Sequence, residues 1–486
     1  MSVSRRSVVS GSAALLAFGG LSRALAQEVE SPLPTPSQIR SDRYASEIVG
    51  YGPLQEDPAG LFDLPPGFSY TVVSRAGDEM DDGLLVPHSA DGMGCLPLGA
   101  GRVALVCNHE IKLRDAEWSA FGSRRERLER FPASALYDRY LDGGPLGGGT
   151  TTIVYDTRAR RTVRRHLSLA GTVNNCAGGV TPEGSWLSCE ETTVRAGDRT
   201  TKDHGWVFEV PAAATGPVEP RPVRGLGRFK HEATATDPRT GVVYLTEDEG
   251  DDGQGLCYRF LPNDRRNLHA GGRLQALGFR GAPDADPRNW REVIWRRGDT
   301  RETVWIDLDG TDNPHDDLRF RGRAAGAAWF ARGEGVFFGR GELFFACTSG
   351  GALRRGQIMR YRPSPWEGQA RERERPGRLQ LFIETDDRAL LDMPDNIAVS
   401  PWGHLVACED KAGAQGVNYL RGITPHGRVY TLGRNPQPLV SNVGANSELA
   451  GACFSPDGST LFVNVYAPGM TLAITGPWNR FSGRRA

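Results

Sequence analysis

The sequence has 486 residues, a formal net charge of −1, 61 glycines and 32 prolines. A chain of this length exceeds the roughly 250–300 residues that one hydrophobic core usually serves, so it needs several domains or one repeated architecture. The near-zero net charge argues against a nucleic-acid partner, and the many glycines and prolines favour short strands joined by tight turns.

The first 26 residues have the three parts of an export signal. A pair of arginines lies in SRRSVV (Ser4–Val9), a weakly apolar run follows, and ALA (Ala24–Ala26) offers a small-residue cleavage site. The apolar run is too short to span a bilayer. We therefore expect residues 1–26 to be a twin-arginine signal peptide, and the protein to be periplasmic or secreted, with the twin-arginine export machinery as a partner and no membrane anchor.

The rest of the chain carries a repeated pattern of polar residue, small residues, apolar strand, Pro/Gly turn, apolar strand and acidic end. We expect residues 27–60 to be an extended segment and residues 61–486 to form the repeat domain. Copies begin at Asp91 (DGMGCLPLGAGRVALVCNHE), Cys176 (CAGGVTPEGSWLSCEE), His231 (HEATATDPRTGVVYLTEDE), Arg332 (RGEGVFFGRGELFFACTSG), Asp395 (DNIAVSPWGHLVACED) and Glu448 (ELAGACFSPDGSTLFVNV).

Six hairpin-centred copies predict an all-β fold, a six-bladed β-propeller with helical and loop insertions. A pair of β-sandwiches or a β-helix is the alternative, but a sandwich has no reason to repeat the hairpin and a β-helix has a shorter period. The segment Arg114–Tyr140 is expected to be a partly helical insertion. Further strands are expected at Thr150–Thr157, Gly205–Val210, Leu256–Pro262, Gln357–Pro363 and Gly427–Gly433.

The charged ends of the copies predict a cation site. The residue before the first strand of a hairpin and the residue after the second lie at the same edge, so the copies should bring their acidic ends to one mouth of the channel. So many carboxylates need cations to remain both ionised and packed. The residues expected there are Cys176, Glu190, Glu191, Glu232, Glu247, Asp248, Glu249, Glu334, Asp395, Glu409, Asp410 and Glu448. The run EDEGDDG, which contains Asp248, is also typical of a charged loop.

The cysteines divide into two kinds. Cys107, Cys189, Cys347 and Cys408 occupy nearly the same place in their second strands, too far apart for disulfides, and are expected to be small buried residues. Cys176 stands where other copies have an acid. A thiol among carboxylates favours a softer metal, such as iron or zinc, beside calcium.

These stretches resemble the PhoX-type alkaline phosphatases over nearly the whole mature chain. The resemblance lies in NCAGGVTPEGSWLSCEET, GRFKHEATATDPRTGVVYLTEDEGD, FARGEG, FACTSGG, MPDNIAVSPWGHLVACED, SELAGACFSPDG and LFVNVYAPGMTLAITGPW. It implies a six-bladed propeller that holds a cluster of iron and calcium and hydrolyses small phosphate monoesters. The chain is shorter than many members of the family, and its insertion in the first copy diverges.

The resemblance also implies roles for individual residues. Cys176 is similar to the thiolate that ligates the iron pair, and Arg332 to the arginine that grips the substrate phosphate. Lys230 is a further candidate for substrate binding. The expected carboxylate ligands are Glu190, Glu232, Glu334 and Glu409 or Asp410, with Asn108 and Glu110 as additional ligands from the first copy.

The expected reaction is an in-line displacement without a protein nucleophile, in a monomeric enzyme. Two other functions remain open from the residues: a calcium-dependent propeller hydrolase of another ester, such as a lactonase, and a non-catalytic propeller that serves as a binding module. Cys176 speaks against the lactonase, because a site that holds only calcium has no use for a thiolate.

Overall fold

The computed structural model describes residues 44–411, 417–437 and 447–481. The predicted signal peptide lies outside the described residues. Among the residues that are described, no helix combines the length and the apolar character needed to cross a membrane. The chain divides into Met1–Ala45 and Ser46–Ala486, and the second unit carries the sheets.

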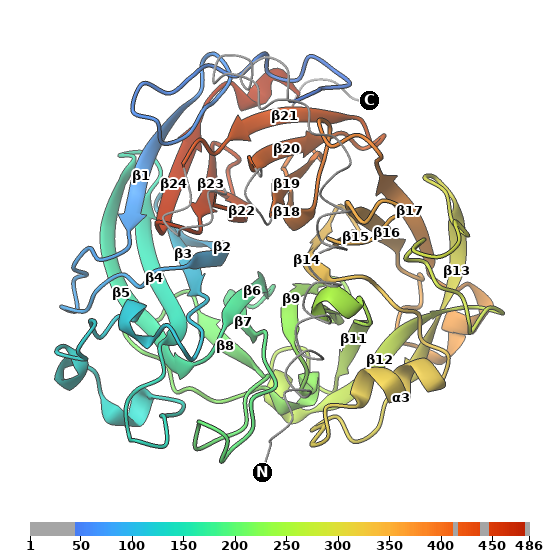
Figure 1. The fold of residues 1–486 in the computed structure, drawn as a ribbon, viewed down its shortest axis with the longest axis horizontal. Coiled ribbons are helices and arrows are strands. Elements are labelled where there is room, and N and C mark those ends of the chain that lie inside the picture. The colour runs from blue at the N-terminus through green and yellow to red at the C-terminus, as the bar shows by residue number, and fades with distance from the viewer. Residues whose placement is uncertain (1–43, 412–416, 438–446, 482–486) are drawn as a thin grey trace, which may run out of the picture. The chain divides into compact units, whose positions relative to one another are not determined.

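Antiparallel sheets surround a central axis in a propeller-like arrangement (Figure 1). Two sheets follow the chain through the first two copies of the repeat. The first contains β2 (Ala90–Gly99), β3 (Arg102–His109), β4 (Gly148–Asp156) and β5 (Arg161–Thr172). The second contains β6 (Asn175–Val180), β7 (Ser185–Glu190) and β8 (Val207–Pro211).

The third and fourth copies share one nine-stranded sheet, because β13 (Thr300–Asp307) pairs with strands of both. On one side of β13 lie β12 (Gly272–Phe279), β11 (Cys257–Pro262), β10 (Val243–Glu247) and β9 (His231–Thr236). On the other side lie β17 (Arg378–Glu384), β16 (Gln357–Arg362), β15 (Glu342–Cys347) and β14 (Gly333–Gly339).

Two four-stranded sheets complete the ring. One contains β18 (Pro394–Val399), β19 (Leu405–Glu409), β20 (Tyr419–Ile423) and β21 (Val429–Arg434). The other contains β22 (Leu449–Phe454), β23 (Thr460–Val465), β24 (Met470–Thr475) and β1 (Ser69–Arg75). Because β1 pairs with β24, the first strand of the described chain belongs to its last sheet.

The predicted all-β propeller is therefore confirmed, whereas the count of six separate blades is not. Four sheets of three or four strands stand apart, and the nine-stranded sheet takes the remaining two copies. The first strands of the six copies nevertheless contact one another in a closed ring, in the order β2, β6, β9, β14, β18, β22 and back to β2 (Figure 1).

Small residues allow this close approach of the inner strands. A Cβ atom added to Gly335 on β14 would lie 2.7 Å from the Cα of Asn396 on β18, closer than real contacts permit. Farther from the axis, the sheets bury aliphatic and aromatic side chains against their neighbours. The cysteines predicted to be core, Cys107, Cys189, Cys347 and Cys408, are all buried there.

Short helices occur outside the sheets. The insertion predicted at Arg114–Tyr140 contains only 3₁₀ turns, η1 (Ala116–Trp118), η2 (Leu128–Arg130) and η3 (Ala133–Ala135), and the α-helix α3 spans Leu318–Ala324. The remaining 3₁₀ turns are η4 (Arg224–Leu226), η5 (Gly250–Asp252), η6 (Leu268–Ala270), η7 (Ala370–Glu374) and η8 (Trp478–Arg480).

Candidate metal centre

The six hairpins pair in the same way at their open ends, where the inner strand begins and the second strand finishes. In each hairpin, the first residue of the inner strand pairs with the last residue of the second strand. The pairs are Ala90↔His109, Asn175↔Glu190, His231↔Glu247, Gly333↔Cys347, Pro394↔Glu409 and Leu449↔Val465. The residue that follows each partner therefore occupies an equivalent place in every copy.

These equivalent places carry most of the acidic residues that gather at the axis. The residues that follow the first partners are Asp91, Cys176, Glu232, Glu334, Asp395 and Ala450. The residues that follow the second partners are Glu110, Glu191, Asp248, Thr348, Asp410 and Tyr466. In the last copy, where Ala450 replaces an acid, Glu448 supplies the carboxylate from two positions earlier.

The ligand atoms of these side chains form four overlapping groups. Within each group, the possible metal-ligating atoms all lie within 4.8 Å of one another. The groups are Cys176–Glu191–Glu232, Glu232–Glu334–Asp395, Asp395–Asp410–Glu448 and Asp91–Glu110–Glu448. We call these residues, together with Asp248, the acidic mouth.

The carboxyl groups of the acidic mouth cannot all be ionised without positive charge beside them. Burial, and then the neighbouring acids, raise the pKa of Glu232 and Glu334 well above the usual value for a glutamate. Burial and the nearby Asp410 raise the pKa of Asp395 to about 7. Burial and neighbouring acids also raise the pKa values of Asp91, Glu191 and Glu448. Such a site binds either protons or cations.

Cys176 is 3 % exposed and sits at the start of β6. Its thiol donates to the carbonyl oxygens of His231, at 3.2 Å, and Glu232, at 3.4 Å. Burial, and then the charge of Glu232, raise the pKa of the thiol well above its ordinary value. A thiolate at this position therefore needs a cation as a direct neighbour.

Arg332 spans two acids of the mouth. Its Nε donates to Asp248 at 3.1 Å and its Nη2 donates to Glu334 at 2.6 Å. Burial acts to lower its pKa, but Glu334 and Asp248 outweigh burial and raise it, so the side chain keeps its charge. The backbone of Arg332 has a φ of 51°, a strained value for a residue with a side chain. Asp248, which accepts from Nε of Arg332 through its Oδ2, is buried, and its other oxygen, Oδ1, has no hydrogen-bond partner among the described residues.

Lysines lie at the rim of the mouth. Lys230, predicted to help bind substrate, pairs with Glu249 at 3.2 Å and is partly exposed. Lys112, which the sequence did not single out, pairs with Oε1 of Glu110 at 3.1 Å. The hydroxyl of Tyr466 donates to the other oxygen of Glu110 at 2.6 Å. Glu110 is thus held from two sides.

The structure does not bring Glu190 into the mouth, contrary to the sequence prediction. Its carboxylate accepts hydrogen bonds from the backbone N–H groups of Val173, at 3.0 Å, Gly205, at 2.9 Å, and Trp206, at 3.1 Å. It also lies 2.7 Å from Nδ1 of His204. Successive residues of a strand point to opposite sides, so the mouth receives Glu191 and the interior of the blade receives Glu190.

Glu409 repeats this arrangement and also lies outside the mouth. Its side chain is fully buried and accepts hydrogen bonds from Nε of Arg421, at 2.8 Å, and from the backbone N–H groups of Asp392 and Tyr419, both at 3.1 Å. Its successor Asp410 is the residue that joins the mouth. Glu247 follows the same rule, with bonds from Leu256 and Tyr258.

Asn108, a predicted ligand, is also satisfied by protein atoms. Its Nδ2 donates to the carbonyl oxygens of Cys176, at 3.2 Å, and Ala177, at 2.7 Å, and its Oδ1 accepts from Trp186 and Ser188 at 2.9 Å. It fixes the strand that carries Cys176 but does not belong to the groups of ligand atoms. The predicted residues that the structure does bring together are Cys176, Glu110, Glu191, Glu232, Glu334, Asp395, Asp410, Glu448 and, through their ion pairs, Arg332 and Asp248.

The residues expected at the mouth from the sequence did not include Asp91, and Asp248 was expected either there or in a charged loop. The repeat contained the signal for both, because Asp91 follows the first residue of its inner strand as Glu232 does, and Asp248 follows Glu247 as Glu191 follows Glu190. The donor set of the mouth, many carboxylate oxygens and one thiol, fits hard cations together with a softer one. The partnerless Oδ1 of buried Asp248 supports that fit.

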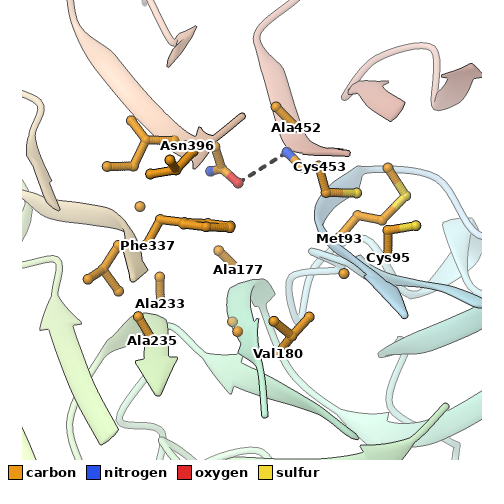
Figure 2. Close-up of a pocket in the computed structure, with 18 of the residues that line it drawn as sticks. Met93, Cys95, Ala177, Val180, Ala233, Ala235, Phe337, Asn396, Ala452 and Cys453 are labelled. Atoms are coloured by element: carbon orange, nitrogen blue, oxygen red, sulfur yellow. Dashed lines mark hydrogen bonds between the residues drawn. The ribbon is translucent and has the colours of Figure 1, made fainter. Parts of the chain in front are cut away.

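Beyond the mouth, the channel becomes apolar. The continuing inner strands line a cavity of about 380 Å³, into which Met93, Ala177, Ala233 and Phe337 project (Figure 2). Asn396 Oδ1 accepts a hydrogen bond from the backbone N–H of Gly451 at 3.1 Å, across the seam between β18 and β22. We call this space the apolar channel.

Comparison with protein families identifies one match, described as "Alkaline phosphatase PhoX", over residues 49–469. Among solved structures, Pseudomonas fluorescens PhoX in complex with vanadate, a transition state analogue, is 19 % identical with a TM-score of 0.62, covering 86 % of this chain and 96 % of that one. No curated protein matches significantly.

Two further structures align with lower TM-scores. The Xanthomonas campestris gluconolactonase XC5397 has a TM-score of 0.36 at 14 % identity, covering 85 % of this chain and 98 % of that one. The β-propeller domain of Cps50 (Swd1) from Myceliophteria thermophila has a TM-score of 0.38 at 11 % identity, covering 79 % and 96 %.

Proposed function

The chain belongs to the alkaline phosphatase PhoX family and is a phosphate monoester hydrolase, and we propose that its reaction takes place at the acidic mouth. The observation that carries this proposal is the convergence of acids from all six copies and one thiol within overlapping groups no wider than 4.8 Å. The four ligand groups share residues, so ions bound in them would lie next to one another.

The metals are proposed to be iron and calcium. Carboxylate oxygens suit calcium, while the Cys176 thiol suits a softer ion, and it belongs to the group with Glu191 and Glu232. When bound, such ions neutralise phosphate oxygens and lower the pKa of a water ligand. The mouth contributes the buried carboxylates that hold the ions and restrain their positions.

Arg332 is proposed to orient the substrate phosphate. Its guanidinium is fixed by Asp248 and Glu334, which leaves Nη1 outside the hydrogen bonds found among the described residues. A guanidinium held in one orientation can donate to a phosphate oxygen with little loss of entropy. Lys230 and Lys112, at the rim, add positive charge that attracts a phosphate dianion. No protein nucleophile is needed in this arrangement.

Export and assembly are further parts of the proposal. The arginine pair in Ser4–Val9, the apolar run and the site at Ala24–Ala26 support export by the twin-arginine machinery to the periplasm or the exterior. That route carries folded proteins, which suits a chain whose metal ligands come from every part of the fold. We propose a monomer that acts on small phosphate esters.

The test is the metal content and the p-nitrophenyl phosphate turnover of one preparation, purified from a host that exports it. The proposal requires iron and calcium in whole-number ratios to protein, and loss of turnover when they are removed. A preparation that turns over the ester after exhaustive chelation, with neither metal present, would overturn the proposed site.

A further inference from the structure

Two thiols face each other across one seam of the apolar channel. Cys95 lies on β2 and is partly exposed, and Cys453 lies on β22 and is 8 % exposed. Both line the cavity of the apolar channel, and Figure 2 shows them on the same wall beside Met93. Neither belongs to the metal groups of the mouth.

The close approach of the two strands brings these thiols together. Both strands begin at the mouth and run away from it, in the same direction. Gly451 on β22 lies beside Met93 on β2, since a Cβ added to Gly451 would be 3.0 Å from the Cβ of Met93. Cys453 and Cys95 lie two residues farther along their strands, on the same wall of the channel (Figure 2). Burial, and then contact with the Cys95 thiol, raise the pKa of Cys453 well above its ordinary value.

This seam differs from the other five in the ring of inner strands. At the others, the chain itself joins the two copies that meet, because they are consecutive. At the seam between β2 and β22, the first copy meets the last, and the pairing of β1 with β24 is the backbone connection that closes the ring. A covalent link placed here would close the largest loop of chain and so constrain the unfolded state most.

We propose that Cys95 and Cys453 form a disulfide under oxidising conditions, and that this bond fastens the first copy of the repeat to the last. The inference depends on neither the phosphatase activity nor the metals of the mouth. An exported protein would meet such conditions, since disulfides form and persist outside the cytoplasm.

The oxidant is a disulfide from the surroundings, of a small molecule or an oxidoreductase. The more exposed Cys95, as thiolate, attacks one sulfur of that disulfide, and the first thiolate leaves. Cys453 then loses its proton to water and attacks the Cys95 sulfur of the mixed disulfide, which releases the second thiolate. Two protein thiols become one S–S bond, and the external disulfide becomes two thiols.

Peptide mapping with oxidised glutathione as the probe tests this proposal. The full protein is incubated with it, quenched with acid, alkylated and digested. We expect a cross-linked pair of peptides that contain Cys95 and Cys453, and a midpoint of thermal unfolding that rises by about 5 °C relative to the reduced protein. Cys347→Ser, which removes a buried thiol on β15, should form the link and show the same rise, whereas Cys95→Ser should show neither.

Mapping of the wild-type protein decides the question even if Cys95→Ser does not fold. The proposal is overturned if both thiols are alkylated separately after oxidation, or if Cys95 carries only glutathione. It is equally overturned if Cys453 is cross-linked to Cys107 instead.

Discussion

Two layers of acids lie one residue apart at the ends of the second strands, and their surroundings are opposite. Glu190 and Glu409 are fully buried, yet their oxygens accept hydrogen bonds from backbone N–H groups, a histidine or an arginine. Glu191 and Asp410 face other carboxylates across the axis. The first layer is satisfied by the protein itself. In the second layer, Asn174 donates to Glu191 at 2.9 Å, but burial and the neighbouring acids still raise the pKa of Glu191 well above its usual value, so this layer favours the binding of cations.

This contrast separates acids with structural partners from acids of the proposed metal site within one sequence motif. Strand alternation determines whether an acid faces the interior of the blade or the mouth, and the groups it meets there determine its role. Substitutions within the same dipeptide can therefore be compared with closely matched chemistry, since Glu190→Gln and Glu191→Gln remove the same charge one position apart.

The largest expected effect is on turnover. We expect Glu191→Gln to lower turnover of p-nitrophenyl phosphate by at least about a hundredfold, because a proposed metal ligand loses its charge. Glu190→Gln should keep turnover within about tenfold of wild type once the protein is folded. Kinetics and metal content of the two purified variants measure this difference. Equal losses of metal in both would erase the distinction between the layers.

For stability we expect the opposite order, with the larger loss at the acid that has structural partners. Glu409→Gln leaves the fully buried Arg421 without its anionic partner, which should cost about 3–5 kcal/mol in the free energy of unfolding. Asp410→Asn should cost far less in metal-free protein, because it removes a repelling carboxylate from the mouth. Denaturant unfolding of both variants after chelation gives the comparison. The layers would not differ as described if Asp410→Asn proved the more destabilising.

The pH dependence of stability should reveal the charged histidine in the structural layer. Burial lowers the pKa of His204, but Glu190 and Asp138 outweigh burial and raise it to about 9. The folded state binds this proton more tightly than the unfolded state does. The stabilisation, on the order of 3 kcal/mol, is therefore complete below about pH 6.5 and lost as the pH rises through about 9.

His204→Gln tests that prediction. The difference in unfolding free energy between wild type and variant should shrink between pH 6.5 and pH 9.5. A difference that stays constant over this range would show that His204 is neutral in the folded protein.

The smallest effect is expected where a thiol only fills space. Cys347→Ala should cost about 1–2 kcal/mol and leave metal content and turnover unchanged, since Cys347 is a fully buried core residue. Cys176→Ser, which keeps the size of the side chain, should lose iron and turnover together. Elemental analysis and kinetics of both variants make the comparison, and iron retained in Cys176→Ser would mean that this thiol is core as well.

Most of the fold could be predicted because the same strand and turn pattern recurs in every copy of the repeat. The six inner hairpins, the further strands and the buried cysteines of the second strands follow from equivalent positions in the copies. The count of separate sheets did not follow, because β13 lies in the long segment between the third and fourth copies and pairs with both of their sheets. Nothing in the repeat specifies such a bridging strand.

The mouth was predicted in outline and misassigned at particular residues. Spacing placed Cys176, Glu232 and Glu334 correctly because each follows the first residue of its inner strand. It could not choose between neighbours such as Glu190 and Glu191, since the choice depends on which side each residue faces and on partners such as His204. Those partners come from distant segments of the chain and have no signature in the motif.

The most direct test of the central claim is an anomalous diffraction measurement on crystals of the exported protein, with data collected on both sides of the iron absorption edge. We expect an iron signal between Cys176, Glu191 and Glu232, and oxygen-coordinated density among the other acids of the mouth. An active protein whose crystals show no iron signal there, or show it beside Glu190 and Glu409, would contradict the account.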